Sequence, residues 1–191
     1  MAEVVSVLSR KGGVGKTVTA MFAAAYLAQQ GIDVAVLDTD PEGSAGAWAR
    51  AAGNLPFQVY PEGKQTQAMK HAWVVIDTPP NDPKALGEAA RLAGRVIVVA
   101  KCNALEADRL IPSLDALAAS GFSGPWGILL TQARGGLGRE MQAALEQEEL
   151  PVLGIVPHLV KFERAFGMVP EDLSEYEGVL GGLLKLRRGK A

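Results

Sequence analysis

The chain has 191 residues, of which 48% are hydrophobic and 21% are charged, and its formal net charge is −2. This length predicts a single domain over residues 1–191, and this composition excludes long disordered stretches. The near balance of charge excludes a protein whose whole surface is built to coat nucleic acid. The charge is uneven, however, because residues 185–191 contain four basic side chains and no acidic one.

Three features of the chain predict a cytoplasmic protein. Apolar residues 4–8 are followed at once by Arg10 and Lys11, so the start of the chain does not resemble a secretory signal. No stretch approaches the ~20 uninterrupted apolar residues that a bilayer span needs. The single cysteine, Cys102, cannot form an internal disulfide or supply a zinc or iron–sulfur cage.

Short apolar runs alternate with helical patterns along the chain. Strands are predicted at residues 4–9, 33–38, 73–77, 95–100, 126–131 and 152–156. Helices are predicted at residues 16–30, 43–53, 83–93, 104–119, 137–148, 159–166 and 172–187. Because the strands are apolar throughout, the pattern predicts an α/β fold with three layers, a parallel β-sheet covered by helices on both faces. Ligands bind such sheets beyond the carboxyl ends of the strands.

A glycine-rich loop follows the first strand. Residues 11–17 read Lys-Gly-Gly-Val-Gly-Lys-Thr, a backbone that can curl around anionic oxygens in front of a helix start. Lys16 is placed to contact nucleotide phosphates, and the Thr17 hydroxyl is placed to ligate Mg²⁺. The alternative is a glycine-rich turn that happens to carry a lysine. The residues expected to bind nucleotide here are Lys11, Gly12, Gly13, Val14, Gly15, Lys16, Thr17 and Val18.

Two acidic motifs end later strands. Residues 37–41 read LDTDP, which places Asp38 and Asp40 on one face of the chain beside the phosphate loop. Residues 73–80 read WVVIDTPP, with Asp77 at the end of a buried strand. Taken alone, these carboxylates could also be caps for the helices that follow.

Taken together, these motifs resemble the ParA/MinD family of deviant Walker ATPases. Arg10 stands where the usual phosphate loop has its first glycine, and Lys11 is the extra lysine of the deviant form. The resemblance extends from about residue 4 to 184 and is greatest to the short, ParF-like partition ATPases of the ParA type. It implies a P-loop NTPase fold of the SIMIBI type, with ATP and Mg²⁺ as the bound cofactors. The chain departs from the family at Val18 and Glu42, where a hydroxyl residue and glutamine are usual.

The resemblance also implies roles for single residues. Lys11 would reach across a dimer interface to the nucleotide of the other subunit, and with Lys16 and Asp40 would form the catalytic set. Asp40 would orient the attacking water, while Asp38 and Asp77 would join Thr17 around the metal. In related proteins the loops that hold Thr131, Pro157 and His158 here contact adenine, although turn chemistry alone also explains a proline. We expect His71, which follows a helical stretch rich in Gln and Lys, to be a solvated side chain.

What the resemblance implies about function is a slow ATPase that forms a homodimer on binding ATP. Such a dimer binds DNA without sequence preference, is associated with the nucleoid, and is stimulated to hydrolyse ATP by a ParB-type centromere-binding partner. Basic side chains would supply the DNA contacts. The candidates are Lys161, Arg164, Lys185, Arg187, Arg188 and Lys190.

Other functions remain open from the sequence. A MinD-like membrane switch needs a C-terminal amphipathic helix, and residues 179–188 pair apolar with basic side chains. Two glycines interrupt that segment, so we favour packing on the core over membrane binding. A biosynthetic ligase with the same fold generally lacks the equivalent of Lys11. A non-catalytic nucleotide-binding module would not need intact Lys16, Asp40 and Asp77.

Overall fold

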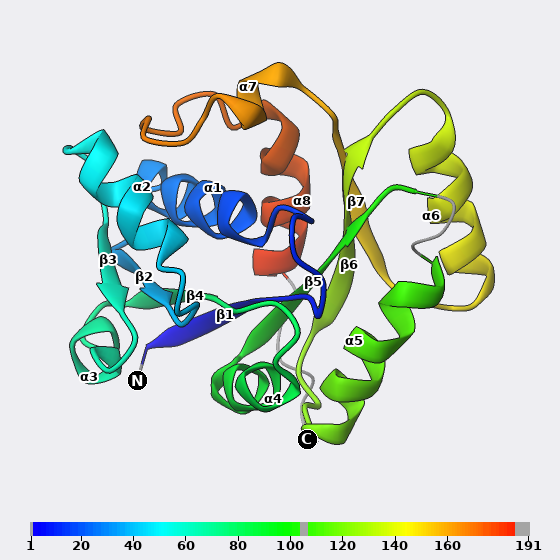
Figure 1. Cartoon of the computed structure of the whole chain (residues 1–191), viewed down its shortest axis with the longest axis horizontal. Helices are drawn as coiled ribbons and strands as arrows, with labels where there is room; N and C mark the ends of the chain where they lie inside the picture. Colours follow the sequence, from blue (N-terminus) through cyan, green and yellow to red (C-terminus); the bar gives the residue numbers. More distant parts are fainter. Residues whose placement is uncertain (1, 104–106, 186–191) are drawn as a thin grey trace.

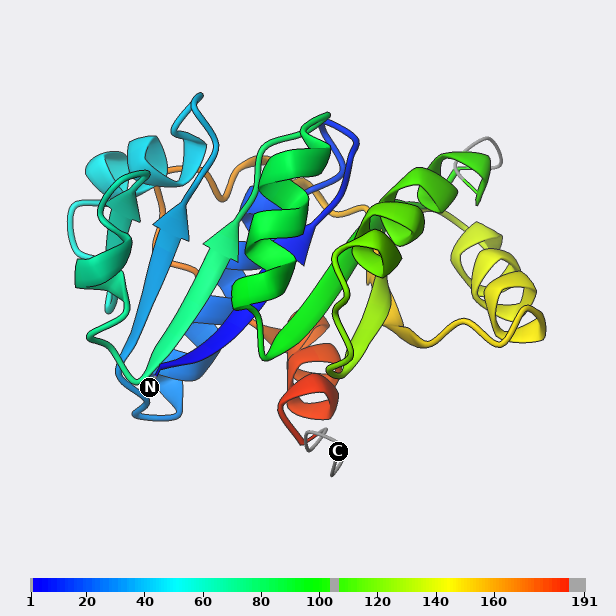
Figure 2. The same ribbon diagram turned by 90° about the horizontal axis from the view of Figure 1, so that it is seen from below.

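A computed structural model describes residues 2–103 and 107–185 and contains a parallel sheet of seven strands. The strands are β1 (Glu3–Leu8), β2 (Val34–Asp38), β3 (Gln58–Pro61), β4 (Trp73–Asp77), β5 (Arg95–Lys101), β6 (Trp126–Ala133) and β7 (Val152–Pro157). Their order across the sheet is β3-β2-β4-β1-β5-β6-β7, and every neighbouring pair is parallel. The loops after the strands therefore gather at one edge of the sheet (Figure 2).

Helices cover both faces of this sheet, as the sequence predicted (Figure 1). They are α1 (Lys16–Gln29), α2 (Ser44–Ala52), α3 (Gln65–Ala68), α4 (Pro83–Leu92), α5 (Ala107–Ala119), α6 (Leu137–Gln147), α7 (Val160–Glu163) and α8 (Ser174–Lys185). One face packs against α1, α2 and α8, and the other against α3, α4, α5 and α6. The predicted three-layer α/β fold is confirmed.

Alternate strand residues build two separate cores. On β1, Val5 and Val7 contribute to the core under α1, while Val4 and Leu8 contribute to the core under α4 and α5. Burying each such side chain contributes about 1.5–3 kcal/mol. The central strands are therefore apolar on both faces, and their carboxyl ends are held rigidly where polar side chains follow.

Two small elements lie between α2 and β4. The sequence does not predict the edge strand β3, while the short helix α3 falls in the helical stretch expected just before His71. The helix expected at residues 159–166 is shorter and covers only Val160–Glu163. The expectation for His71 is wrong, because its Nδ1 lies 2.7 Å from Asp33 Oδ1 and its Nε2 lies 3.1 Å from the Tyr60 hydroxyl. These contacts fasten the edge strand to its neighbours.

The last helix packs on the core. Val179 and Leu180 are buried against the α1 side of the sheet, which confirms the expected packing for these two residues, while the side chains of Leu183 and Leu184, expected to pack in the same way, are not described. Lys185 ends α8 and its side chain is not described, while Arg187, Arg188 and Lys190 lie outside the described residues. Among the described residues, no helix has both the length and the apolar character needed to cross a membrane.

Candidate nucleotide site

A cavity of about 410 Å³ lies at the carboxyl edge of the sheet. The predicted phosphate loop, the loop after β2 and the loops after β6 and β7 all contribute to its wall. The expected nucleotide-binding residues that line it are Gly12, Gly13, Val14, Gly15, Lys16, Thr17, Val18, Thr131, Pro157 and His158. Lys11 is not among the lining residues. The topology therefore brings the predicted phosphate and base segments to one cavity.

The phosphate loop takes the backbone shape that anion binding requires. Gly13 and Gly15 have φ angles of 71° and 96°, in the left-handed region that other residues rarely adopt. Helix α1 begins directly after Gly15, and no side chain caps its first turn. Its N–H groups and the positive end of its dipole are thus left for an anion.

Lys16 is a buried cation at the start of α1. Its Nζ donates a 2.9 Å hydrogen bond to the Lys11 carbonyl oxygen. Burial lowers the pKa of Lys16, and the charges of Asp77, Asp40 and Glu42 oppose that shift. The ammonium group therefore lies in a field of carboxylates at the position where phosphate oxygens would be neutralised.

Asp77 is the most deeply buried carboxylate of the site. It lies beside Asp38 across the β2–β4 pairing, and neither of its oxygens makes a hydrogen bond with normal geometry. Burial raises the pKa of Asp77 to about 7, although the nearby Thr17 hydroxyl and Lys16 charge lower it. An unpartnered buried carboxylate is costly, and a cation would compensate it.

These residues fit a Mg²⁺ ion that is held mainly by phosphate and water. No group of three or more His, Cys, Asp or Glu side chains is arranged to hold a metal within residues 2–103 and 107–185. Mg²⁺ keeps several waters and commonly takes only one or two protein ligands beside substrate phosphates. The Thr17 hydroxyl and the unpartnered oxygens of Asp77 match that demand.

Asp38 and Asp40 have different surroundings. Asp38 is buried, and its oxygens accept hydrogen bonds from the N–H groups of Asp40 at 3.2 Å and Gly46 at 2.9 Å. Burial raises the pKa of Asp38 against these bonds. Asp40 lines the cavity, and its Oδ1 accepts a 3.0 Å bond from the N–H of Glu42, which also lines it. Asp38 thus fixes the loop that carries Asp40.

The end of β6 is bonded to the phosphate loop. The Thr131 hydroxyl donates to the Val14 carbonyl at 2.7 Å, and the Gln132 amide donates to the Gly13 carbonyl at 2.8 Å. Gln132 has a φ of 54°, a conformation that a residue with a side chain rarely adopts. This strain is consistent with a residue held in place by its functional contacts.

The cavity wall near residues 158–163 also contains side chains that the sequence did not predict, namely Phe162, Glu163 and Tyr176. His158 Nε2 lies 2.7 Å from an Arg134 nitrogen and 3.3 Å from Glu163 Oε1. Phe162 and Tyr176 line the cavity and pack on one another, with ring centroids 5.7 Å apart. Phe162 comes from α7 and Tyr176 comes from α8. No local motif marks either residue, so only the fold shows that they belong to the site.

The two described DNA-binding candidates differ in their contacts. Lys161 Nζ lies 2.7 Å from Asp172 Oδ2 and 3.8 Å from Glu175 Oε1. Arg164 follows α7 directly and is exposed. The charge of Lys161 is therefore already balanced by acids of this chain.

Comparisons with known proteins agree with this geometry. A sequence profile of the family described as CobQ/CobB/MinD/ParA nucleotide binding domain matches residues 5–168. The chain is 39% identical to maintenance of carboxysome distribution protein A of Gloeobacter kilaueensis over 103 residues, which cover 50% of this chain and 47% of that protein. It is 35% identical to the chromosome-partitioning ATPase Soj of Thermus thermophilus over 92 residues, which cover 47% of this chain and 36% of Soj. The chain thus spans about half, or less, of the length of these relatives.

The fold is also similar to that of solved structures. One is the MinD cell division protein of Aquifex aeolicus, with a TM-score of 0.78 at 14% identity. The superposition covers 100% of this chain and 98% of that protein. At this identity the likeness concerns the fold and not the activity.

Proposed function

The chain belongs to the CobQ/CobB/MinD/ParA nucleotide-binding family, and from that premise we propose that it is an ATP-hydrolysing partition ATPase. In this proposal ATP and Mg²⁺ bind in the cavity, two copies of the chain associate on ATP, and the dimer binds DNA. Hydrolysis is slow until a ParB-type partner stimulates it. The observation that carries the proposal is the convergence of Lys16, Thr17 and Asp40 on one cavity, with Asp77 buried close to Lys16 and Thr17.

Different residues at the cavity have different roles in phosphoryl transfer. Lys16 and the N–H groups of residues 12–17 bind the β- and γ-phosphates. Thr17 and Asp77, supported by Asp38, would hold Mg²⁺, whose charge offsets that of the phosphate oxygens when it is bound. Asp40 orients a water molecule in line with the γ-phosphorus. A new P–O bond then forms as the bond to the β–γ bridging oxygen breaks.

The base and ribose would lie against the loops after β6 and β7. Thr131, Pro157 and His158 contribute to that part of the wall, as do Phe162 and Tyr176. Apolar and aromatic walls with a few polar groups are typical of nucleotide sites. The observed lining supports the proposed base contacts of these residues.

Lys11 supports the dimer part of the proposal. It does not line the cavity of its own chain, although its neighbours in the loop do. We propose that its ammonium group reaches the nucleotide of a second copy. The resulting dimer would present each DNA-contacting group twice. A chain with a formal net charge of −2 could therefore bind DNA once it has dimerised. Exposed Arg164 and the basic residues 185–190 are the proposed contacts.

The alternatives have less support. Val179 and Leu180 are buried in the core, so these two apolar side chains of α8 are not available to a membrane. A ligase would not need the second lysine of the loop. The proposal therefore favours positioning of DNA cargo by an ATP-switched dimer that associates with the nucleoid.

The test is nucleotide-dependent dimerisation. Sedimentation of the wild-type chain with Mg²⁺ and a non-hydrolysable ATP analogue should show a dimer, and the apo protein and the Lys11→Ala variant should stay monomeric. Wild-type protein should release phosphate from ATP and should bind DNA only when ATP is present. In a liposome flotation assay the protein should not float with the liposomes. A wild-type chain that remains monomeric with the analogue, or that floats with liposomes, would contradict the proposal.

A further inference from the structure

We propose that Lys161 is a positioning residue for the nucleoside part of the cavity, and that it is not a DNA contact. It would hold the base-side wall, which we define as His158, Leu159, Phe162 and Glu163, against the start of α8. All four wall residues line the cavity. The inference rests on the proposed function, because it assumes that the cavity binds ATP.

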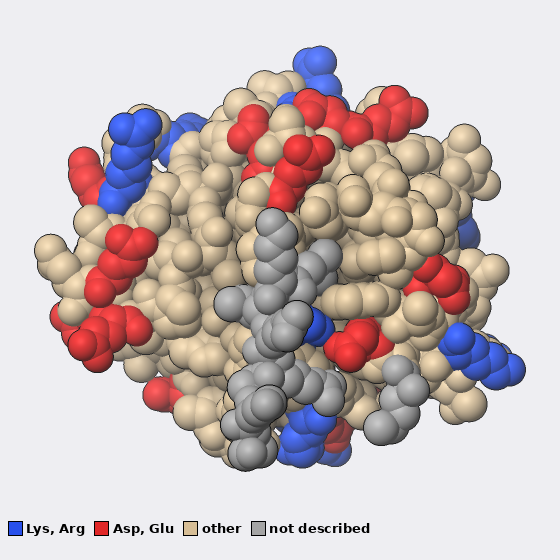
Figure 3. Space-filling model, turned by 180° about the vertical axis from the view of Figure 1, so that it is seen from behind, with Lys and Arg blue, Asp and Glu red and all other residues tan. Residues whose placement is uncertain are grey.

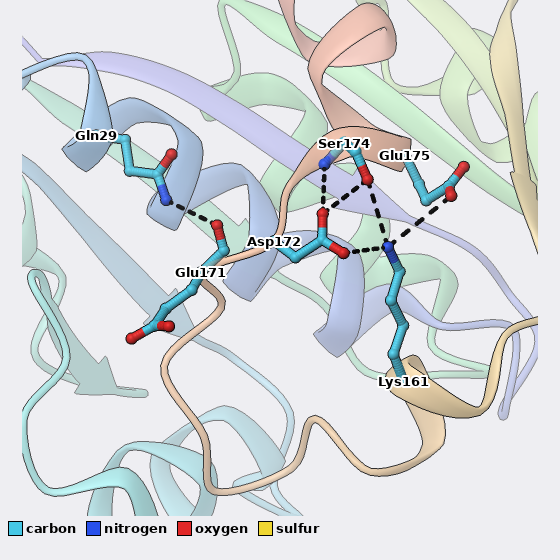
Figure 4. A network of polar contacts seen from close by, with 6 residues as sticks. All are labelled: Gln29, Lys161, Glu171, Asp172, Ser174 and Glu175. Carbon is cyan, nitrogen blue, oxygen red and sulfur yellow. Dashed lines mark hydrogen bonds and ion pairs between the residues drawn. The ribbon is translucent and has the colours of Figure 1, made fainter.

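Lys161 is the centre of a polar network between α7 and α8. Its Nζ donates a 2.7 Å hydrogen bond to Asp172 Oδ2 and a 3.4 Å bond to the Ser174 hydroxyl. Glu175 Oε1 lies 3.8 Å from the same nitrogen. Figure 4 shows these acceptors arranged around the ammonium group, all from the loop and helix start that follow α7 in the chain. One side chain thus joins two segments that flank the cavity.

The acceptors of this network are themselves anchored. Asp172 Oδ1 accepts bonds from both the N–H and the hydroxyl of Ser174, so the carboxylate is fixed at the start of α8. The preceding carbonyl of Glu171 accepts a 3.2 Å bond from Gln29 at the end of α1. The contacts with Lys161 and Ser174 lower the pKa of Asp172 to about 2, so its charge is present at any working pH. Lys161 is therefore bonded to a fixed point of the framework.

The wall needs such an anchor. Helix α7 has four residues and no side-chain cap, so its own hydrogen bonds contribute little to its order. On its inner side, Phe162 packs against Phe22 and Tyr176, with centroid distances of 5.3 and 5.7 Å. On its outer side, Lys161 Nζ lies 5.3 Å from the centre of the Phe162 ring and is held there by the acids. The ring packing and the contact with Lys161 together fix the position at which Phe162 lines the cavity.

The same surroundings argue against a DNA contact. A phosphate would have to displace Asp172 and Glu175 from Lys161 and leave those carboxylates without their cation. Glu171 and Glu177 add further negative charge near the start of α8. Figure 3 shows acidic side chains close together along the upper edge of the rear face, with basic side chains projecting above them. An acidic surface of this kind repels a DNA backbone.

The test compares a ligand that contacts the wall with one that does not. Affinities for Mg²⁺–ATP and for Mg²⁺–tripolyphosphate are measured for wild type and for Lys161→Met, which removes the charge and keeps the aliphatic packing. Lys161→Arg retains the ion pair, and Asp172→Asn removes it while keeping an acceptor for Ser174. Lys64→Ala removes an exposed lysine beside α3, on the other face of the sheet, and is the matched control.

We expect Lys161→Met and Asp172→Asn to weaken ATP binding by about two- to fivefold, since a partly exposed ion pair contributes modestly. Tripolyphosphate affinity should not change, and the KM for ATP should rise without a change in kcat. Lys161→Arg and Lys64→Ala should match wild type. At saturating ATP, Lys161→Met should bind DNA with wild-type affinity and salt dependence.

Three results would overturn the inference. They are unchanged ATP affinity in Lys161→Met, an equal loss of ATP and tripolyphosphate binding, and a smaller salt dependence of DNA binding at saturating ATP. In each of these cases the wild-type chain still binds ATP, so the proposed function stands. A wild-type chain that binds neither ligand overturns the proposed function, and this inference with it.

Discussion

The side-chain ammonium of Lys16 donates a 2.9 Å hydrogen bond to the backbone carbonyl of Lys11, five residues earlier in the chain. This bond joins the side chain of Lys16 to the first residue of the phosphate loop and holds the ammonium group beside the loop backbone. Lys16 therefore shapes the loop, in addition to its proposed function of neutralising phosphate.

The first prediction concerns this lysine. Lys16→Ala removes the buried cation and leaves the Lys11 carbonyl without its donor, so ATP affinity should fall by at least about 100-fold. Isothermal titration with Mg²⁺–ATP measures the loss, and Lys64→Ala should titrate as wild type does. Retained ATP affinity in Lys16→Ala would show that the phosphates bind elsewhere.

The second prediction separates binding from turnover at Asp40. Because Asp40 lines the cavity from the loop after β2, Asp40→Ala should still bind ATP. It should hydrolyse ATP at least about 100-fold more slowly, the range expected when a water-positioning group is lost. Phosphate release and sedimentation with ATP measure both effects, and the variant should persist as a dimer. Normal hydrolysis by this variant would exclude the proposed role.

The phosphate loop and the acidic motifs could be predicted from sequence because each is local. The shape of the loop depends on glycines within residues 11–17, and Asp77 ends a run of buried strand residues that is recognisable without a structure. The parallel sheet followed from strands that are apolar on both faces. The fold then showed that Thr131 and Pro157 share one cavity with the loop, as the family resemblance implied.

The features that could not be predicted depend on contacts between distant segments. The edge strand β3 reads Gln-Val-Tyr-Pro, which is short, ends in proline and buries little, so its pattern is weak. Tyr176 falls within the predicted helix at residues 172–187, and only the fold shows that it lines the cavity. The partners of His71 and Lys161 lie 11 to 38 residues away, which no local pattern encodes.

The third prediction concerns DNA. Binding to non-specific duplex DNA should require ATP and weaken steeply with added salt, because each phosphate contact releases counterions. Substituting the four basic residues of the tail together (Lys185, Arg187, Arg188 and Lys190) by alanine should lower the slope of log affinity against log salt by about 0.9 for each DNA phosphate that the tail neutralises. Fluorescence anisotropy over a salt series measures the slope. An unchanged slope would place the contacts at Arg164 or elsewhere.

The fourth prediction concerns the bond between β6 and the phosphate loop. Thr131→Val preserves the side-chain shape but removes the donor to the Val14 carbonyl. We expect a loss of about 1–2 kcal/mol of folding free energy, seen as a melting temperature lower by about 2–6 °C. Gln132→Ala removes the corresponding, more exposed bond to Gly13 and should destabilise the protein less. Equal melting temperatures for Thr131→Val and wild type would contradict this ranking.

The fifth prediction uses the single cysteine as a probe of the same region. Cys102 is buried directly after β5, its N–H donates to the Thr131 carbonyl at 2.8 Å, and burial raises the pKa of its thiol to about 11. At pH 8 the native thiol should therefore react with a disulfide reagent at least about 100-fold more slowly than the thiol of the urea-unfolded chain. Mg²⁺–ATP should slow the native reaction further, because a ligand that binds only the folded state lowers the population of opened molecules. A thiol reaction rate in the native protein equal to that in the unfolded chain would mean that the end of β5 opens freely. It would contradict our conclusion that Thr131 is firmly attached to the phosphate loop.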